Sequence, residues 1–398
     1  MEKGVIWKIL VTFGYFLLHS QNARSFHFPQ GSHQLRRASS SRRPAHSCRD
    51  WFIERGLEEH EFSILAKNFP EVQSYNFEDN MKPLVEWLCS RGFADGDEVG
   101  IGELFLMFPP IFELSIEKDM EPVVTWLSNR GFTDNDINSM IAREPSLLAT
   151  DVVASMKPCA EWLSKFELLQ LPGNIINQML FQEPMLLCWT PSDQMQPAWD
   201  WITGERGLPT ELAGYLVAGF PKLLGIPVPN MQAVARYLYE HIGLTDNEIN
   251  GVIEEEPWLL GLSVEEHLYP ALDWYARERG IPDETLSFMF RDFPACLGFH
   301  REYQLQPVAT WLEETLEQNF PDLLHPWGRK IAMEEGWSKE EEMRVCVNQV
   351  LADCPGFFTL PPPALAEGWA AARRALGEGV PGTEVARLLL RDPSEFFR

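Results

Sequence analysis

The sequence has 398 residues, of which 45% are hydrophobic, and it carries a formal charge of −25 from 58 acidic and 33 basic side chains. This composition is too apolar for a disordered chain, and it excludes a collagen, a coiled coil and a disulfide-rich miniprotein. The seven cysteines include no CxxC pair, which indicates a reducing compartment rather than a disulfide framework or a zinc finger. Because an acidic chain repels phosphate groups at long range, any nucleic-acid site must be a local stripe of positive potential.

Residues 1–49 differ from the rest in having eight basic side chains against one acidic side chain, which leaves a charge of −32 for the remainder. An apolar run over residues 9–18 is too short to cross a membrane and has the length of a signal-peptide core. Small residues at Ala23 and Ser25 precede Phe26, and the stretch that follows is basic and rich in serine. We therefore expect a signal-peptide-like segment at 1–25 and a basic transit-like segment at 26–49.

This order of segments resembles the bipartite presequence of algae with secondary plastids, in which a Phe follows the cleavage site. It implies delivery to the plastid (chloroplast), and a mitochondrial presequence is the alternative. A secreted protein ranks third, because an odd number of cysteines argues against it. We expect no membrane segment in the mature protein.

Residues 50–398 contain an internal repeat. An anchor proline recurs at steps of 36 to 39 residues, apart from one step of 61, at Pro70, Pro109, Pro145, Pro184, Pro221, Pro257, Pro294, Pro355 and Pro393. A second proline follows most anchors by thirteen residues, at Pro83, Pro122, Pro158, Pro197, Pro270 and Pro307. Four residues later comes a tryptophan column, Trp87, Trp126, Trp162, Trp201, Trp274 and Trp311, and then in most units a link glycine. Such periodicity predicts an all-α solenoid of helix-pair repeats.

Each unit is predicted to contain two helices. The second proline should bend the first helix, because it removes a backbone donor. The second helix should begin at capping boxes such as Thr133 with Asp136 and Thr245 with Glu248, and it should end before the anchor proline. Start signals for first helices are predicted at Ser263 with Glu266, Asn76 with Asp79, and Thr190 with Asp193. The step of 61 residues indicates an insertion of roughly 24 residues near 313–335.

The phrase EPWLLGLSVEEHLYPALDWYARERG, residues 256–280, resembles the repeat of the mitochondrial transcription termination factor (mTERF) family. The resemblance covers about residues 50–398. It implies an α-superhelix of helix pairs, each closed by a short 3₁₀ turn, and a role on nucleic acid inside an organelle in transcription termination or initiation, ribosome biogenesis or splicing. The octotricopeptide class of algae shares the Pro-x-x-x-Trp phrase and is the nearest rival.

Two columns of cations are candidates for contact with nucleic acid. The first precedes the link glycine: Arg55, Arg91, Arg130, Arg206 and Arg279. The second lies two or three residues before the anchor proline: Lys67, Arg143, Arg291 and Arg391. Either column can instead stabilise its helix, because a cation in the last turn complements the helix dipole. Stacking of the units would align each column into a stripe.

The tryptophan column is predicted to be core rather than a base-stacking surface, because it shares the spacing of an apolar column two residues before the second proline: Met81, Met120, Met156, Met195, Leu268 and Leu305. No catalytic, cofactor or metal motif is present in the sequence, so we expect no enzyme activity and no cofactor. Two functions remain. A monomeric factor could dock double-stranded DNA or RNA and regulate organellar gene expression, together with protein partners. Alternatively, an acidic protein-interaction scaffold could use the same repeats without nucleic acid.

Overall fold

The fold was analysed in a computed structural model, which describes residues 48–54, 58–75, 78, 81–93, 101–169, 174–319, 338–376 and 386. The helical elements occur in the same order in each repeat, and the described residues contain no strand. Residues 1–47, which hold both predicted presequence segments, lie outside the described part, as do Asn76, Asp79 and the predicted insertion from 320 onward.

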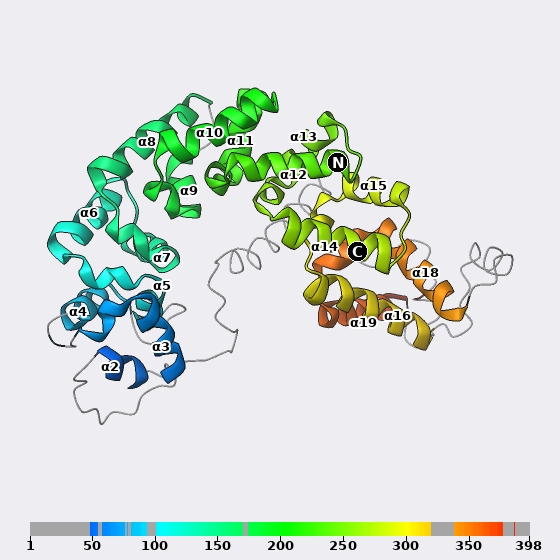
Figure 1. The fold of residues 1–398 in the computed structure, drawn as a ribbon, viewed down its shortest axis with the longest axis horizontal. Coiled ribbons are helices and arrows are strands. Elements are labelled where there is room, and N and C mark those ends of the chain that lie inside the picture. The colour runs from blue at the N-terminus through cyan, green and yellow to red at the C-terminus, as the bar shows by residue number, and fades with distance from the viewer. Residues whose placement is uncertain are drawn as a thin grey trace. The chain divides into compact units, whose positions relative to one another are not determined.

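The described array consists of two compact units that divide between Pro227 and Val228. The first unit contains α2 (Cys48–Glu54), α3 (Glu59–Asn68), α4 (Lys82–Ser90), α5 (Ile101–Met107), α6 (Glu121–Asn129), α7 (Asp134–Arg143), α8 (Lys157–Leu163), α9 (Ile175–Gln182), α10 (Gln196–Asp200) and α11 (Thr210–Gly219). The second contains α12 (Val228–Glu240), α13 (Asp246–Glu255), α14 (Tyr269–Asp273), α15 (Asp283–Asp292), α16 (Gln306–Asn319), α18 (Lys339–Asp353) and α19 (Pro362–Leu376). Within each unit, successive helix pairs follow one another in chain order (Figure 1).

The second helix of each repeat ends two residues before its anchor proline, as predicted. The residue that precedes the proline leaves the helical region, with φ near −140° and ψ near 75° at Glu144 and Phe220. A 3₁₀ turn begins at the proline itself, at η1 (Pro70–Gln73), η3 (Pro109–Glu113), η5 (Pro145–Ala149), η8 (Pro184–Cys188), η11 (Pro221–Gly225), η12 (Pro257–Gly261), η15 (Pro294–Gly298) and η17 (Pro355–Thr359). These turns bury apolar pairs such as Leu147 and Leu148, which close each repeat against the core.

The second proline of a repeat marks a change in helix type. The first helix opens with one π-helical turn, at η4 (Ile116–Met120), η6 (Val152–Met156), η9 (Pro191–Met195), η13 (Val264–Leu268) and η16 (Arg301–Leu305), and it becomes α-helical at the residue before the proline. A wider turn accommodates the ring, which would clash with the carbonyl four residues earlier in an α-helix. Where Val234 replaces the proline, α12 is a continuous helix of 13 residues.

Two first helices also end in a π-helical turn, at η10 (Trp201–Glu205) and η14 (Trp274–Glu278). In these repeats the link glycine follows the tryptophan by six residues instead of five. One extra residue inside a helix is absorbed as a π bulge. The link glycines themselves have φ between 68° and 99°, a conformation that glycine adopts without strain.

Three capping boxes are complete: Thr133 with Asp136, Thr245 with Glu248, and Ser338 with Glu341. The first two were predicted. The Ser263 side chain accepts a hydrogen bond from the Glu266 N–H as expected. Thr190 is the N-cap residue of η9, so the helix begins where predicted, but its side chain makes no capping hydrogen bond. No helix in the described ranges is long and apolar enough to cross a membrane.

Candidate nucleic-acid interface

The arginines before the link glycines face the next repeat. The Arg130 Nε donates to Asn177 Oδ1, and the Asn177 amide donates back to the Arg130 carbonyl at 2.9 Å. Arg279 exchanges the same two hydrogen bonds with Asn348, at 3.0 and 2.8 Å. In both pairs an arginine at the end of a first helix is joined to an asparagine on the second helix of the next repeat, α9 for Asn177 and α18 for Asn348.

The remaining members of this column fit the same description only in part. The Arg91 carbonyl accepts from Asn138, while its guanidinium pairs with Asp134 at 3.2 Å. Arg206 is half-buried at the end of η10, and Arg55 lies outside the described residues. Guanidinium groups also lie over the tryptophan ring of their own repeat, 5.0 Å from the Trp126 centroid for Arg130 and 5.7 Å from the Trp274 centroid for Arg279.

Two guanidinium groups of this column are too buried to form a phosphate-binding stripe. The side chains of Arg91 and Arg279 are only 12% and 7% exposed, and Arg279 also forms an ion pair with Glu313 at 2.6 Å. A phosphate contact would require these guanidinium groups to leave hydrogen bonds that join two repeats. Arg91, Arg130 and Arg279 therefore stabilise the array, and we do not assign them to nucleic acid.

The second column, before the anchor prolines, lies at the ends of the second helices. Arg143 donates to the main-chain carbonyls of Phe181 and Gln182 at the end of α9, and its guanidinium lies 4.8 Å from the centroid of the Phe181 ring. Burial lowers the pKa of Arg143, but an arginine remains charged at neutral pH. Arg143 therefore caps the C-terminal end of α9 and keeps a fixed positive charge beside the last turns of α7 and α9.

Arg291 and Lys67 are more accessible than Arg143. The Arg291 side chain is 41% exposed and pairs with Glu248 at 2.7 Å, and its guanidinium lies 5.3 Å from the Phe288 centroid. Lys67 is exposed in the last turn of α3. Arg391 lies outside the described residues. The accessible cations of the described part of this column thus sit on second helices.

The tryptophan column joins neighbouring repeats, and most of its members are not fully buried. Trp201 and Trp274 are 3% and 0% exposed, whereas Trp87, Trp126, Trp162 and Trp311 are half-buried. The indole N–H groups of Trp87, Trp162 and Trp274 donate to Glu121, Gln196 and Gln306, the residues that precede the second proline of the next repeat. The prediction of a core column is therefore confirmed fully at two positions and in part at the others.

Sequence reasoning did not identify the exposed apolar side chains of the second helices. One such side chain lies on each of six second helices: Ile64, Met107, Phe181, Tyr215, Phe288 and Val345. Phe181 is 37% exposed and Tyr215 is 55% exposed. Five of them lie three, six or ten residues before the anchor proline, on the same helical face as Lys67 and Arg291, whereas Met107 lies two residues before it. The signal that could have found these five is the repetition at three, six or ten residues before the anchor proline.

Acidic side chains are scarce in the C-terminal turns of the second helices of the first unit. The last seven residues of α3, α5, α7, α9 and α11 contain one acid, Glu103, and two cations, Lys67 and Arg143. The first-helix segments of the same unit, residues 82–90, 116–129, 152–163 and 191–205, contain eight acids and three lysines. We call the last seven residues of these five helices the second-helix face. It is less acidic than the described first-helix segments of that unit because the other acids of these five helices lie in their first turns: Glu59, Glu61, Asp134, Asp136 and Glu211.

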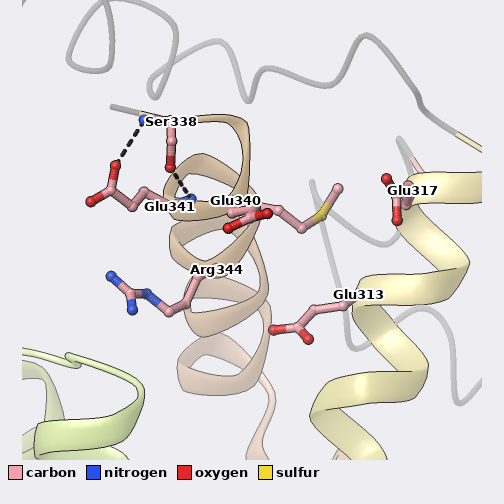
Figure 2. Close-up of a pocket in the computed structure, with 7 residues that line it drawn as sticks. Glu313, Glu317, Ser338, Glu340, Glu341 and Arg344 are labelled. Carbon is pink, nitrogen blue, oxygen red and sulfur yellow. Dashed lines mark hydrogen bonds between the residues drawn. The ribbon is translucent and has the colours of Figure 1, made fainter. Parts of the chain in front are cut away.

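A separate hollow of about 500 Å³ between α16 and α18 has the opposite character. Glu313, Glu317, Glu340 and Glu341 lie around it, with Arg344 beside them (Figure 2). Hydrogen bonds from the backbone and side chain of Ser338 lower the pKa of Glu341 and keep it charged. The described residues include no group of three His, Cys, Asp or Glu side chains that could hold a metal ion. So negative a hollow repels phosphate.

The tandem helix pairs, each closed by a 3₁₀ turn, define an all-α helical-repeat protein. The model of the mTERF family matches residues 85–187, which run from α4 through η8. This match confirms the family resemblance drawn from the sequence over residues 85–187. A comparison with curated proteins gives no match to the chain.

Proposed function

We propose that the protein binds nucleic acid through the second-helix face of its first unit and regulates gene expression in an organelle. The observation that carries the proposal is the mTERF match over residues 85–187, which includes α5, α7 and α9 of this face. The scarcity of acids in the last seven residues of these helices, in a chain of charge −25, supports it. At physiological salt the Debye length is about 8 Å, so acids on other surfaces are largely screened from a phosphate bound there.

The test is binding of fluorescent duplex DNA, duplex RNA and single strands as salt rises from about 50 to 200 mM. A phosphate binder loses affinity steeply over this range. The variant Lys67→Glu should weaken binding to every sequence and flatten the salt slope by about one unit for each phosphate that the protein no longer neutralises. The matched control is Lys118→Glu, an exposed lysine on the first-helix side of the same unit. Equal effects of the two variants would remove the second-helix face from the proposal.

The second candidate function is an acidic protein-interaction scaffold. Exposed aromatic side chains on the first helices of the second unit favour it, with Tyr239 61% and Tyr303 76% exposed. An apolar protein interface keeps its affinity as salt rises, so the same salt titration against a captured protein partner separates the two functions.

We further propose that residues 1–49 deliver the protein to a plastid, with the mitochondrion as the alternative. The support is the order of an apolar run, small residues before Phe26 and an acid-free basic stretch. Fusion of residues 1–49 to a fluorescent protein should direct it to the plastid of an alga with a secondary plastid, and Phe26→Ala should block the last step. Mitochondrial delivery that ignores Phe26 would favour the alternative.

A further inference from the structure

We propose that the second-helix face binds single-stranded nucleic acid, with Phe181 and Tyr215 as platforms on which unpaired bases stack. The inference rests on the proposed function, and it names the ligand class of that same surface. The sequence had led us to expect a docked duplex, whereas this inference names a single strand as the ligand. It also assigns base stacking to exposed side chains of the second helices and not to the tryptophan column.

The first support is the exposure and placement of the two rings. Phe181 is 37% exposed and Tyr215 is 55% exposed, and they lie on α9 and α11, which pack side by side within one unit. Single exposed aromatics are ordinary on a protein surface. Here, however, the second helices α3 and α5 also expose one large apolar side chain each, Ile64 and Met107. Four of the five helices of this face therefore expose one large apolar side chain, and Ile64, Phe181 and Tyr215 share one helical face.

The second support is the kind of polar group around the rings. Gln178, Gln182 and Ser139 are exposed on α9 and α7, and their amides and hydroxyl can donate to and accept from base edges. Arg143 contributes a positive charge held 4.8 Å from the Phe181 centroid, and Lys67 contributes a second charge on α3. Single-strand sites combine cations that follow the phosphate backbone with aromatic side chains on which successive bases stack, and this face offers both.

The third support is the placement of the acids. A protein partner with an apolar contact surface would not require acids to be kept away from the contact, whereas a polyanion would. The two glutamates that directly follow α7 and α9 are turned inward. Glu144 accepts a hydrogen bond from Ser146, and burial raises the pKa of Glu183. The charge distribution thus favours an anionic ligand.

The geometry favours a single strand over a duplex because stacking needs a free base face. In a duplex, neighbouring base pairs cover these faces, and a protein reaches only the groove edges and the phosphates. Exposed flat rings on a surface with few cations would contribute little to duplex binding. The same rings can each accept one unpaired base from RNA or from DNA.

The experiment uses the full chain and fluorescent oligonucleotides of mixed sequence, as single-stranded RNA, single-stranded DNA and duplex. We expect the single strands to bind more tightly than the duplex. Phe181→Leu and Tyr215→Leu remove the ring but keep an apolar side chain, and each should weaken single-strand binding by roughly tenfold or more. The salt slope should stay unchanged, because neither change removes a cation that faces a phosphate. Whichever of RNA and DNA binds more tightly identifies the natural strand.

Matched controls separate the outcomes. Tyr239→Leu and Tyr303→Leu remove exposed rings elsewhere and should leave binding unaltered. Tyr215→Trp should retain affinity, and its indole fluorescence should be quenched when a single strand binds. Unchanged binding by both Phe181→Leu and Tyr215→Leu, or a duplex bound as tightly as a single strand, overturns the inference and leaves the proposed function standing. Failure of the unmodified chain to bind any nucleic acid overturns both, and a protein partner then becomes the occupant of this face.

Discussion

Arg279 and Asn348 lie 69 residues apart in the sequence, and they exchange two hydrogen bonds between adjacent repeats. The equivalent pair, Arg130 and Asn177, is 47 residues apart. The difference, 69 − 47 = 22 residues, is close to the roughly 24 residues by which one step between anchor prolines exceeds the others. The extra residues therefore lie between a first helix and its second helix, and the repeat register on either side is preserved.

Removal of the Arg279 side chain is expected to destabilise the second unit. Arg279→Ala leaves Asn348 Oδ1 and the half-buried Glu313 carboxylate without their donor, which should cost about 2 to 4 kcal/mol of unfolding free energy. Arg279→Lys should recover little, because a lysine lacks the planar fork that reaches both partners at once. The control is Arg277→Ala, whose side chain is 84% exposed, with an expected change within about 0.5 kcal/mol. Urea unfolding followed by circular dichroism measures all three.

Gly225 is expected to tolerate no side chain. A Cβ at this position would lie 2.1 Å from Cη2 of Trp189, whose ring covers the turn from the preceding repeat. Gly225→Ala should therefore cost about 1 to 3 kcal/mol through overpacking. Gly219→Ala is the matched control, because a Cβ there meets nothing within 4 Å and the residue is helical. A gain of up to about 1 kcal/mol is expected for the control. Equal melting temperatures for the two variants would contradict the packing assignment.

The tryptophan column should not be energetically uniform. Trp274 is fully buried, and Trp274→Ala should cost about 3 to 5 kcal/mol, as for other large-to-small changes in a core. Trp126 is only half-buried, so Trp126→Ala should cost clearly less. Thermal melting of the two variants compares them directly. A Trp126→Ala variant that melts as low as Trp274→Ala would show that the half-exposed ring carries equal packing energy.

The capping boxes predict an acid-sensitive stability. Hydrogen bonds from the side chain and backbone of Thr133 lower the pKa of Asp136, and the backbone and side chain of Thr245 do the same for Glu248. A carboxylate whose pKa is lower in the folded state stabilises the fold above its unfolded pKa, and this contribution is lost as the pH falls through the folded pKa. Stability should thus decline below about pH 4.5. The Asp136→Asn, Glu248→Gln double variant should lose less stability on acidification, as measured by urea unfolding at stepwise lower pH.

The local rules of the fold were accessible from the sequence because prolines and caps act over a few residues. The anchor prolines determine where the second helices end, and Thr133 and Thr245 determine where two of them begin. The π-helical turns were not predicted. They arise where Pro122 or its equivalents would clash in an α-helix and where one extra residue precedes the link glycine.

The roles of the cations and of the exposed rings could not be settled by spacing. Arg130 and Arg143 occur at regular positions in the repeat, yet whether a regular position faces solvent or the next repeat depends on the neighbours that cover it. For the same reason, the spacing of Phe181 beside Leu180 is typical of a core pattern, although only Leu180 is buried. Periodicity identifies a helical face and not the partner of that face.

The reciprocal pairs between repeats also bear on how the chain acquires its structure. Each arginine at the end of a first helix needs only the second helix of the following repeat, 47 residues later, or 69 where the insertion intervenes. Contacts of such short sequence separation favour fast folding and do not require the whole chain to be present. A chain that emerges gradually, from a ribosome or through a membrane pore, can therefore complete one repeat after another in the order in which they appear.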